Sequence, residues 1–292
     1  MLRNKSQGLN MHVSDFICQS IGRLKLSGYE RYINGLLPDD SDLKLKHTEA
    51  CVIIYPGSNR DGWWTCNDLI NQLTERAIPI FERTHPNKIA LFMFDNSSNH
   101  GAFADDALLV SRINMGDGTK MPLLRDGTKP DGSTHVMTYI DDKGLIKRCN
   151  ACKKNKPDPK NPKCCATRIL SAQSDFASQR SRIQEVIEAA GHMCIFYPKF
   201  HCELNYIESF WAEAKRVARL SCDYSFRGLK RTVPRALDSV GLIKIRRFAR
   251  RSERFMSAYK LGLSRKAAAF AVKKYRSHRR IPEKVLEEFA RD

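Results

Sequence analysis

The sequence predicts an α/β core followed by a basic helical tail. Three observations predict it: short apolar runs typical of strands, amphipathic segments between them, and a strongly basic C-terminal region with helical spacing. With 292 residues, 42% of them hydrophobic, the chain can bury a sizeable core, which excludes wholesale disorder. It has no long apolar run and no apolar leader at its start, so we expect neither a membrane span nor secretion.

The expected elements follow the order strand, strand, helix, strand, insertion, helix, strand, helices. Apolar runs predict strands at residues 11–18, 51–56, 89–94 and 193–197. The third of these, IALFMF, is a continuous apolar run of the kind that is buried on both faces. Apolar residues three and four apart predict helices at 65–84 (bent at Pro79), 168–190 (ending at Gly191), 204–220, 226–240, 242–262, 264–276 and 282–290.

Residues 101–165 differ in composition and predict a long insertion with little core of its own, because they are rich in Gly, Pro, Lys and Asp. Within it, Cys149 and Cys152 have the spacing of two ligands of a tetrahedral Zn²⁺, and Cys164 and Cys165 could complete the set. Adjacent cysteines are awkward joint ligands, so free thiols are the alternative. Ten cysteines in a chain of this length are too sparse for a disulfide scaffold and fit a reducing compartment.

The positive charge is concentrated at the C-terminal end of the chain. Residues 211–292 hold 23 basic and 8 acidic residues, whereas the first 210 residues are almost balanced, within a net charge of +18. The helical spacing predicts one basic helix face, made by Arg247, Arg250, Arg251 and Arg254. Such a face tracks phosphates without reading sequence, so DNA is the expected partner; a merely solvated surface is the alternative. The basic run at 272–280 could also serve nuclear import.

Two carboxylates follow predicted strands. Asp95 comes directly after the apolar run at 89–94, and Glu208 lies in the first turn of the helix that follows the strand at 193–197. Ligands gather at the carboxyl ends of strands in open α/β sheets. Two oxygen ligands there suit Mg²⁺ or Mn²⁺, which can support phosphodiester cleavage. Position alone is a weak signal, because an Asp at a strand end is more often a turn or cap residue and a Glu at a helix start often serves the helix dipole.

Two local motifs favour the interpretation of Asp95 and Glu208 as metal ligands. Asp95-Asn96-Ser97-Ser98-Asn99-His100 resembles the DNxxxH segment of mariner-type transposases, and residues 198–208, PKFHCELNYIE, with Trp211 and Lys215, resemble their WPxxSPDLNPIExxWxxxK segment. The whole chain resembles a fungal branch of DDE superfamily endonucleases carried by transposable elements.

The resemblance implies an RNase H-like core with a mixed sheet flanked by helices, and three carboxylates that bind divalent metal to cut DNA. By it, Asp95 and Glu208 are metal ligands, while Asn96, His100 and Asn205 support the site and Lys215 contacts DNA. Tyr206 stands where the family usually has Pro, which should reduce rigidity at the helix start.

The resemblance also implies three regions: a core at 1–100 and 166–220, the insertion at 101–165, and a basic helical extension at 221–292. It further implies a first strand that carries the first Asp. Nothing before Met11 is long or apolar enough for that strand, if 11–18 and 51–56 are the second and third. We therefore expect an N-terminally truncated copy of the element, a gene model that starts too late, or a fragment. Asp15 is a surrogate first carboxylate, since alternation places it on one strand face with Met11, Val13 and Ile17. Asp61 fits a turn.

We therefore expect a transposase-derived DNA-binding protein of the nucleus or cytoplasm, able to form a homo-oligomer and catalytically incomplete without its first Asp. Loss of one ligand at such a site costs on the order of 100-fold or more in rate. One alternative is an active metal-dependent endonuclease completed by Asp15 or an upstream segment. The other is a non-enzymatic nucleic-acid-binding protein organised by zinc.

Overall fold

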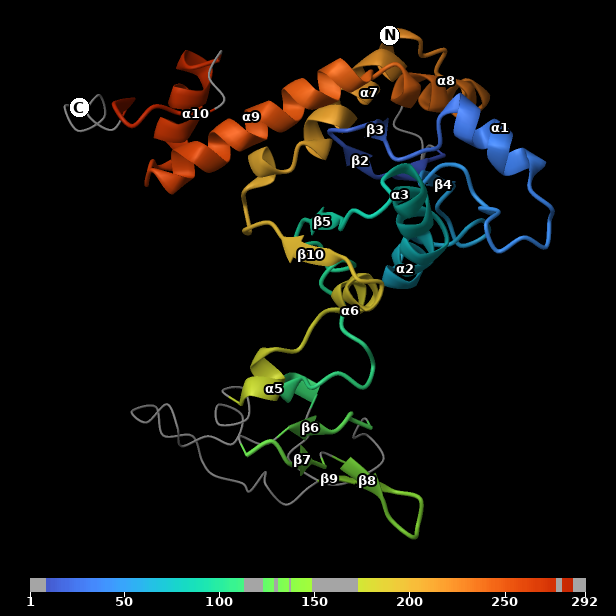
Figure 1. Cartoon of the computed structure of the whole chain (residues 1–292), viewed down its shortest axis with the longest axis vertical. Coiled ribbons are helices and arrows are strands. Elements are labelled where there is room, and N and C mark those ends of the chain that lie inside the picture. The colour runs from blue at the N-terminus through green and yellow to red at the C-terminus, as the bar shows by residue number, and fades with distance from the viewer. Residues whose placement is uncertain are drawn as a thin grey trace. The chain divides into compact units, whose positions relative to one another are not determined.

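The computed structural model describes residues 9–112, 123–128, 131–136, 138–148, 173–276 and 280–285 (Figure 1). Over these ranges the protein is mixed α/β, with short paired strands and several helices. It divides into two units: residues 1–100 with 186–292, and residues 101–185. The predicted boundaries differ from this division, because residues 166–185 fall with the insertion and residues 221–292 fall with the core.

The N-terminal part of the first unit carries strands, one short helix and one long interrupted helix. Its elements are β1 (His12–Ser14), β2 (Ile17–Cys18), β3 (Gly22–Arg23), α1 (Gly28–Leu36), β4 (Val52–Ile54), α2 (Cys66–Gln72), η1 (Leu73–Ala77), α3 (Ile78–Thr84) and β5 (Leu91–Phe94).

The rest of the first unit is one strand and a run of helices. Its elements are α6 (Arg182–Ala189, which begins in the second unit), β10 (Met193–Phe196), η3 (Cys202–Leu204), α7 (Ile207–Leu220), α8 (Phe226–Asp238), α9 (Leu242–Lys260) and α10 (Arg265–Lys274). The helix predicted at 282–290 lies largely outside the described residues. No helix within the described ranges has the length and apolar character needed to cross a membrane.

The strands of the first unit pair two by two. β1 is antiparallel to β4, with Val13 opposite Ile53, and β2 is antiparallel to β3. β5 and β10 are parallel, with Phe94 opposite Phe196, so both strands end at the same edge. The single strand predicted at 11–18 is therefore interrupted after Ser14, where Asp15 and Phe16 separate β1 from β2.

The prediction that residues 89–94 form a strand buried on both faces is wrong. Along β5 the burial alternates, and Leu91 is 48% exposed while Phe92 and Phe94 are buried. The partner strand β10 shows the same pattern, with Met193 57% exposed. A continuous apolar sequence does not distinguish a strand covered on one face from a strand covered on both.

The helix predicted at 65–84 forms as α2, η1 and α3 in succession. Thr65 and Asp68 form a capping box at its start. A π-helical turn, η1, comes directly before Pro79, which lies in the first turn of α3. Because proline lacks a backbone N–H and its ring crowds the preceding turn, the helix widens at this point, close to the predicted bend.

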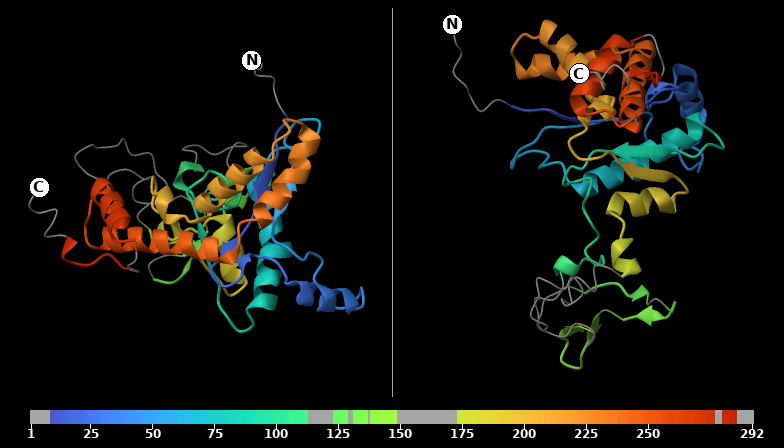
Figure 2. Two further views of the ribbon diagram at one scale, coloured as in Figure 1. Left: turned by 90° about the horizontal axis from the view of Figure 1, so that it is seen from above. Right: turned by 90° about the vertical axis from the view of Figure 1, so that its left-hand side faces the viewer.

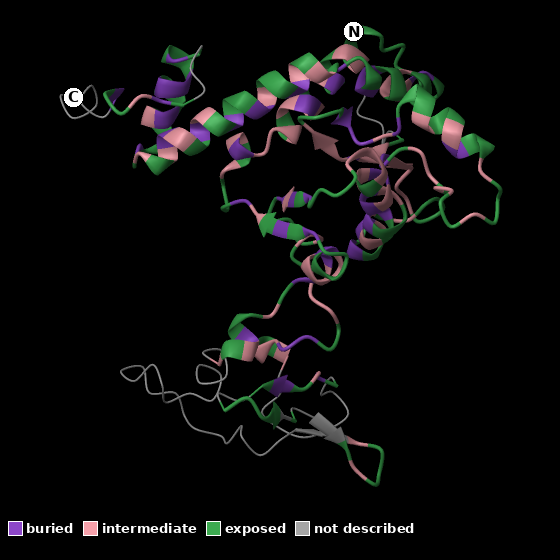
Figure 3. Ribbon diagram, viewed as in Figure 1, coloured by how far each residue is buried: buried purple, intermediate pink, exposed green. Residues whose placement is uncertain are grey.

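The C-terminal helices pack onto the core rather than forming a separate tail. Buried side chains of α7, α8 and α9 and of Cys51, which precedes β4, make one apolar cluster, with Phe210 fully buried among Cys51, Leu237 and Ile245. α9 is the long helix between α8 and α10 (Figure 2), and exposed and buried positions alternate along it (Figure 3). Its buried face accounts for its stability, because apolar burial is the main favourable contribution to folding.

The second unit consists of two short hairpins and short helical turns. The hairpins pair β6 (Gly127–Thr128) with β7 (Thr134–His135) and β8 (Thr138–Ile140) with β9 (Ile146–Arg148). The described residues of this unit also form a 3-10 turn, η2 (Val110–Arg112), and α5 (Ser174–Ala177). The four cysteines of the predicted zinc site, Cys149, Cys152, Cys164 and Cys165, lie outside the described residues.

We predict that Phe210→Ala lowers the free energy of unfolding by about 3–5 kcal/mol, because it removes a fully buried aromatic ring and leaves a cavity. The matched control is Phe200→Ala, which truncates a side chain that is 87% exposed and should change stability by less than about 0.5 kcal/mol. Urea unfolding followed by circular dichroism measures both. Equal effects at the two positions would contradict the packing described for α7.

Candidate carboxylate site

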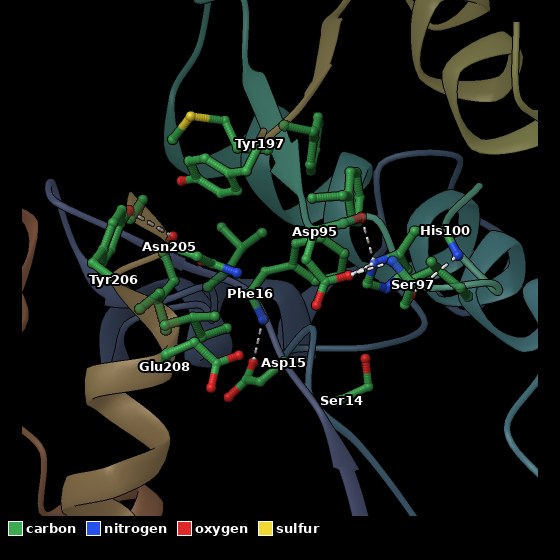
Figure 4. Close-up of a pocket in the computed structure, with 18 of the residues that line it drawn as sticks. Ser14, Asp15, Phe16, Asp95, Ser97, His100, Tyr197, Asn205, Tyr206 and Glu208 are labelled. Atoms are coloured by element: carbon green, nitrogen blue, oxygen red, sulfur yellow. Dashed lines mark hydrogen bonds and ion pairs between the residues drawn. The ribbon is translucent and has the colours of Figure 1, made fainter. Parts of the chain in front are cut away.

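A pocket of about 540 Å³ in the first unit brings together segments that are far apart in the sequence. It is lined by the turn after β1, the loop after β5 and the start of α7, and these contribute Asp15, Asp95 and Glu208 respectively. His100 and Asn205 line the same pocket. In Figure 4 the carboxyl groups of all three acidic residues face its interior.

Asp95 is placed by the end of β5 and held by the turn that follows. Its Oδ1 accepts a hydrogen bond from the backbone N–H of Ser97 at 3.0 Å and lies 2.6 Å from Nδ1 of His100. His100 packs in turn against the Phe94 ring, with ring centroids 5.1 Å apart. The carboxylate is half-exposed, so it faces the pocket from a fixed position while staying open to solvent.

Asp15 is buried where β1 breaks off, with only 1% of its side chain exposed. Its Oδ1 accepts from the Phe16 N–H at 2.9 Å, and its Oδ2 accepts from Nε of Arg23 at 2.6 Å. Burial raises the pKa of Asp15 to about 6, and the Arg23 guanidinium opposes that rise. A buried carboxylate of this kind persists only with a charged partner, which Arg23 provides.

Arg23 connects Asp15 to two further acidic residues. It contacts Oδ1 of Asp238, at the end of α8, at 2.5 Å and Oε2 of Glu49 at 3.5 Å, while its own side chain is 7% exposed. Lys25 also contacts Asp238, at 2.6 Å. Although partial burial acts to raise it, these cations hold the pKa of Asp238 below its ordinary value. The position of Asp15 therefore depends on β3 and on α8.

Glu208 lies in the first turn of α7 and is exposed toward the pocket. Within the described ranges its carboxylate makes no hydrogen bond or ion pair, so it is available to a ligand. The start of its helix is anchored by Tyr206, whose hydroxyl donates to the Ile17 carbonyl at 3.1 Å. Burial raises the pKa of that hydroxyl, which keeps it a donor. Tyr206 thus ties α7 to β2, although it was expected to loosen the helix start.

Asn96 and Asn205 act on the backbone around the pocket. The Asn96 side-chain amide donates to the Tyr197 carbonyl, just past β10, and so joins the ends of the two parallel strands. The backbone carbonyl of Asn205 accepts a hydrogen bond from the backbone N–H of Glu208 at 3.1 Å, in the turn that begins α7. Both residues support the positions from which Asp95 and Glu208 reach the pocket.

The donor set of the pocket consists of carboxylate oxygens, which suit a hard divalent cation such as Mg²⁺. No three His, Cys, Asp or Glu side chains within the described ranges are gathered closely enough to form a metal-binding group. Protein groups already contact two of the carboxylates: Arg23 Nε donates to Oδ2 of Asp15, and Nδ1 of His100 lies 2.6 Å from Oδ1 of Asp95. A cation would therefore compete with these two groups for the carboxylates.

The predicted DNA-contacting residues lie outside this pocket. Lys215 is exposed on α7, and Arg247, Arg250 and Arg251 are exposed on α9. Arg254 is half-buried and donates to the Arg276 carbonyl at 2.5 Å. Burial, with added repulsion from Arg251 and Arg250, lowers its pKa, which indicates a concentrated positive charge on this face of α9.

Several residues that position the site do not stand out in the sequence. Arg23 and Tyr206 act through contacts with residues far away along the chain. Phe16 packs edge-on against Phe92 and Phe94, with centroids 5.8 and 6.1 Å apart, and so holds the Asp15 turn beside β5. Asp61, by contrast, occupies the turn expected for it, where Oδ2 accepts from the Tyr55 N–H at 2.7 Å.

Comparison with known proteins adds no relative: the chain matches no protein-family model, no curated protein sequence and no solved structure.

We predict that Arg23→Leu lowers the free energy of unfolding by about 3–5 kcal/mol, because it leaves the Asp15 carboxylate buried without its partner. Adding Asp15→Asn to that variant should recover part of the loss, since the uncompensated charge is then gone. Arg31→Leu, at an exposed position of α1, is the control and should have little effect. If the double variant is no more stable than Arg23→Leu in urea unfolding, the ion pair does not hold this turn.

Proposed function

We propose that the protein is a metal-dependent DNA endonuclease whose carboxylate site comprises Asp15, Asp95 and Glu208. The observation that supports the proposal most is the convergence of these three acidic side chains on one pocket, from positions 80 and 113 residues apart along the chain. The motif resemblance of residues 95–100 and 198–215 to mariner-type transposases of the DDE superfamily supports it independently. An RNase H-like arrangement of the core belongs to the same proposal.

The placement of Asp15 favours the active alternative over a catalytically incomplete protein. In the sequence, the first carboxylate is missing only if residues 11–18 are taken as the second strand of the core. In the structure, Asp15 lies at the end of β1 and lines the pocket with the other two acids. This position supports the proposal that β1 and Asp15 take the place of the strand that carries the first catalytic carboxylate.

Mg²⁺ or Mn²⁺, when bound, would polarise the scissile phosphate and lower the pKa of an attacking water. On the protein side, Glu208 offers an unoccupied carboxylate, while Asp95 is oriented by His100 and the Ser97 N–H. Asp15 enters the site from a buried turn, so its position is the most constrained of the three. Asn96 and Asn205 keep the strand ends and the helix start at fixed positions around the metal-binding oxygens.

DNA is the proposed substrate because the basic face of α9 lies in the same unit as the pocket. α9 carries no acidic residue in its first turn and five arginines between Arg246 and Arg254. Within the described ranges no carboxylate pairs with Arg247, Arg250 or Arg251, so their charges are available to phosphates. Localisation to the nucleus goes with this substrate.

We predict that the full-length protein nicks supercoiled plasmid DNA in Mg²⁺ or Mn²⁺ and that EDTA abolishes the reaction. Asp95→Asn, Glu208→Gln and Asp15→Asn should each reduce the rate by about 100-fold or more, because each replaces a negatively charged carboxylate ligand with a neutral amide. Asp40→Asn, at an exposed position, is the matched control and should keep the wild-type rate.

Three outcomes separate the possibilities. Loss of nicking in all three variants supports the proposal. Nicking that needs Asp95 and Glu208 but not Asp15 removes Asp15 from the site. DNA binding without any nicking by the wild-type protein rejects the endonuclease and leaves a binding protein, for which zinc content would then be measured in the protein and in Cys149→Ser.

A further prediction concerns α9. The double variant Arg247→Ala/Arg251→Ala should weaken duplex DNA binding and reduce the slope of log K against log salt by about two, because two phosphate contacts are lost. Arg31→Ala/Lys88→Ala removes the same charge from exposed positions elsewhere and is the control. Fluorescence anisotropy over a salt series measures both. Equal slopes for the two double variants would mean that only net charge matters.

A further inference from the structure

A second surface of the first unit combines aromatic rings with unpaired cations. It is formed by the loop between β4 and α2 and by the start of α8, and we call Tyr55, Arg60, Trp63, Phe226 and Lys230 the aromatic–basic surface. The Tyr55 and Phe226 rings meet edge to face with centroids 5.6 Å apart. Lys230 Nζ lies 4.2 Å from the Tyr55 centroid and 4.9 Å from that of Phe226, and the Arg60 guanidinium carbon lies 5.7 Å from the Phe226 centroid.

The loop holds Trp63 in the solvent. Its neck is closed by two backbone hydrogen bonds between Gly57 and Gly62, at 3.1 and 3.3 Å, and Gly62 has a φ of 73°, which glycine adopts without strain. The next residue, Trp64, is fixed: its ring stacks on His12 with centroids 5.2 Å apart, and its carbonyl accepts from Asn99 Nδ2 at 3.0 Å. Trp63 is nevertheless 70% exposed, so an ordered loop presents a bare indole face.

This surface borders the carboxylate pocket. His12 and Trp64 both line the pocket and stack on one another at its rim. His12 is opposite Ile54 in the β1–β4 ladder, and Tyr55 follows Ile54 directly. The path from the carboxylates to the aromatic–basic surface therefore crosses a single strand pair.

The cations of this surface form no ion pair among the described residues, although the Asp61 carboxylate lies in the same loop and accepts from the Tyr55 N–H. α8 carries the cations Arg227, Lys230 and Arg235, and within the described part of the chain none of them pairs with a carboxylate. The same holds for Arg60. Of the cations on this helix, Arg231 is the one that meets an acid, Asp223, at 3.3 Å. A polyanion is the complement of such a surface.

The phosphates of duplex DNA can bind the cations of this surface. Its bases cannot stack on the exposed Trp63 ring, however, because their faces are already stacked on one another. An unpaired strand can bind both the cations and the ring, since its phosphates meet the cations and any of its bases can stack on an aromatic face. We propose that the aromatic–basic surface binds a single-stranded nucleic acid segment that leads to the carboxylate pocket, with Trp63 stacking on an unpaired base. The destination of the strand rests on the proposed endonuclease function; the binding itself does not.

The test is binding of a fluorescein-labelled twelve-nucleotide single strand and of a duplex of the same length, measured by anisotropy with the full-length protein in EDTA. Trp63→Ala should weaken single-strand binding by about tenfold, the effect of losing one base stack, and duplex binding by less than about twofold. Trp63→Phe should restore most of the loss, because it restores a ring. Tyr29→Ala, at a position that is 74% exposed on α1, is the aromatic control and should bind both as wild type does.

Two further measurements keep the proposal falsifiable. Lys230→Met should lower the salt slope of single-strand binding by about 0.7, the value for one lost phosphate contact on a single strand. The variant Asp95→Asn/Glu208→Gln should keep single-strand binding, so that failure of the endonuclease proposal is distinguished from failure of this one.

The inference is overturned if Trp63→Ala leaves single-strand binding unchanged, if it weakens single strand and duplex equally, or if Trp63→Phe is as defective as Trp63→Ala. The last result would indicate a general loss of the loop structure, or a role of the indole in a contact with another protein, in place of base stacking.

Discussion

The candidate site depends on the buried ion pair between Asp15 and Arg23. Without the guanidinium, a carboxylate with 1% of its side chain exposed would carry a large desolvation cost. With it, the chain can break off β1 at Asp15, turn through Phe16 and continue into β2 while the carboxylate stays at the pocket. Arg23 also contacts Asp238 at the end of α8, so the same cation joins the first strands to the C-terminal helices. This explains why helices α8 and α9 pack as part of the core.

The sequence was sufficient for the features that are local. The apolar runs place β4, β5 and β10, and the spacing of apolar residues places α7 to α10 within a few residues of their observed ends. Gly191 ends α6 with a φ of 79°, as a C-terminal stop should. Asp95 and Glu208 were identified from their place after a strand and at a helix start, and both line the same pocket.

The other features of the fold and the site could not be predicted from the sequence, because they depend on contacts between residues that are far apart along the chain. Alternation alone left Asp15 either at a site or buried among apolar neighbours, and the deciding partner, Arg23, lies beyond a turn on β3. The sequence does not predict the exposure of Leu91 on β5, because Leu91 is as apolar as the buried Phe92 and Phe94. Tyr206 was expected to weaken the start of α7, since its compensation is a hydrogen bond to Ile17, nearly two hundred residues away.

Charge placement connects the two proposals. A pocket of three acidic side chains repels the phosphates of its own proposed substrate, and Arg23 offsets only the buried one, because Asp95 and Glu208 remain open to solvent. A bound divalent cation would offset the others locally, but approach of the strand needs attraction from outside the pocket, over distances of about a Debye length. The arginines of α9 and the cations Arg60 and Lys230, which form no ion pair among the described residues, supply that attraction. A carboxylate-based nuclease therefore requires an acidic pocket and separate basic surfaces. The acidic pocket alone would bind metal but not DNA, and the basic surfaces alone would bind DNA but not metal.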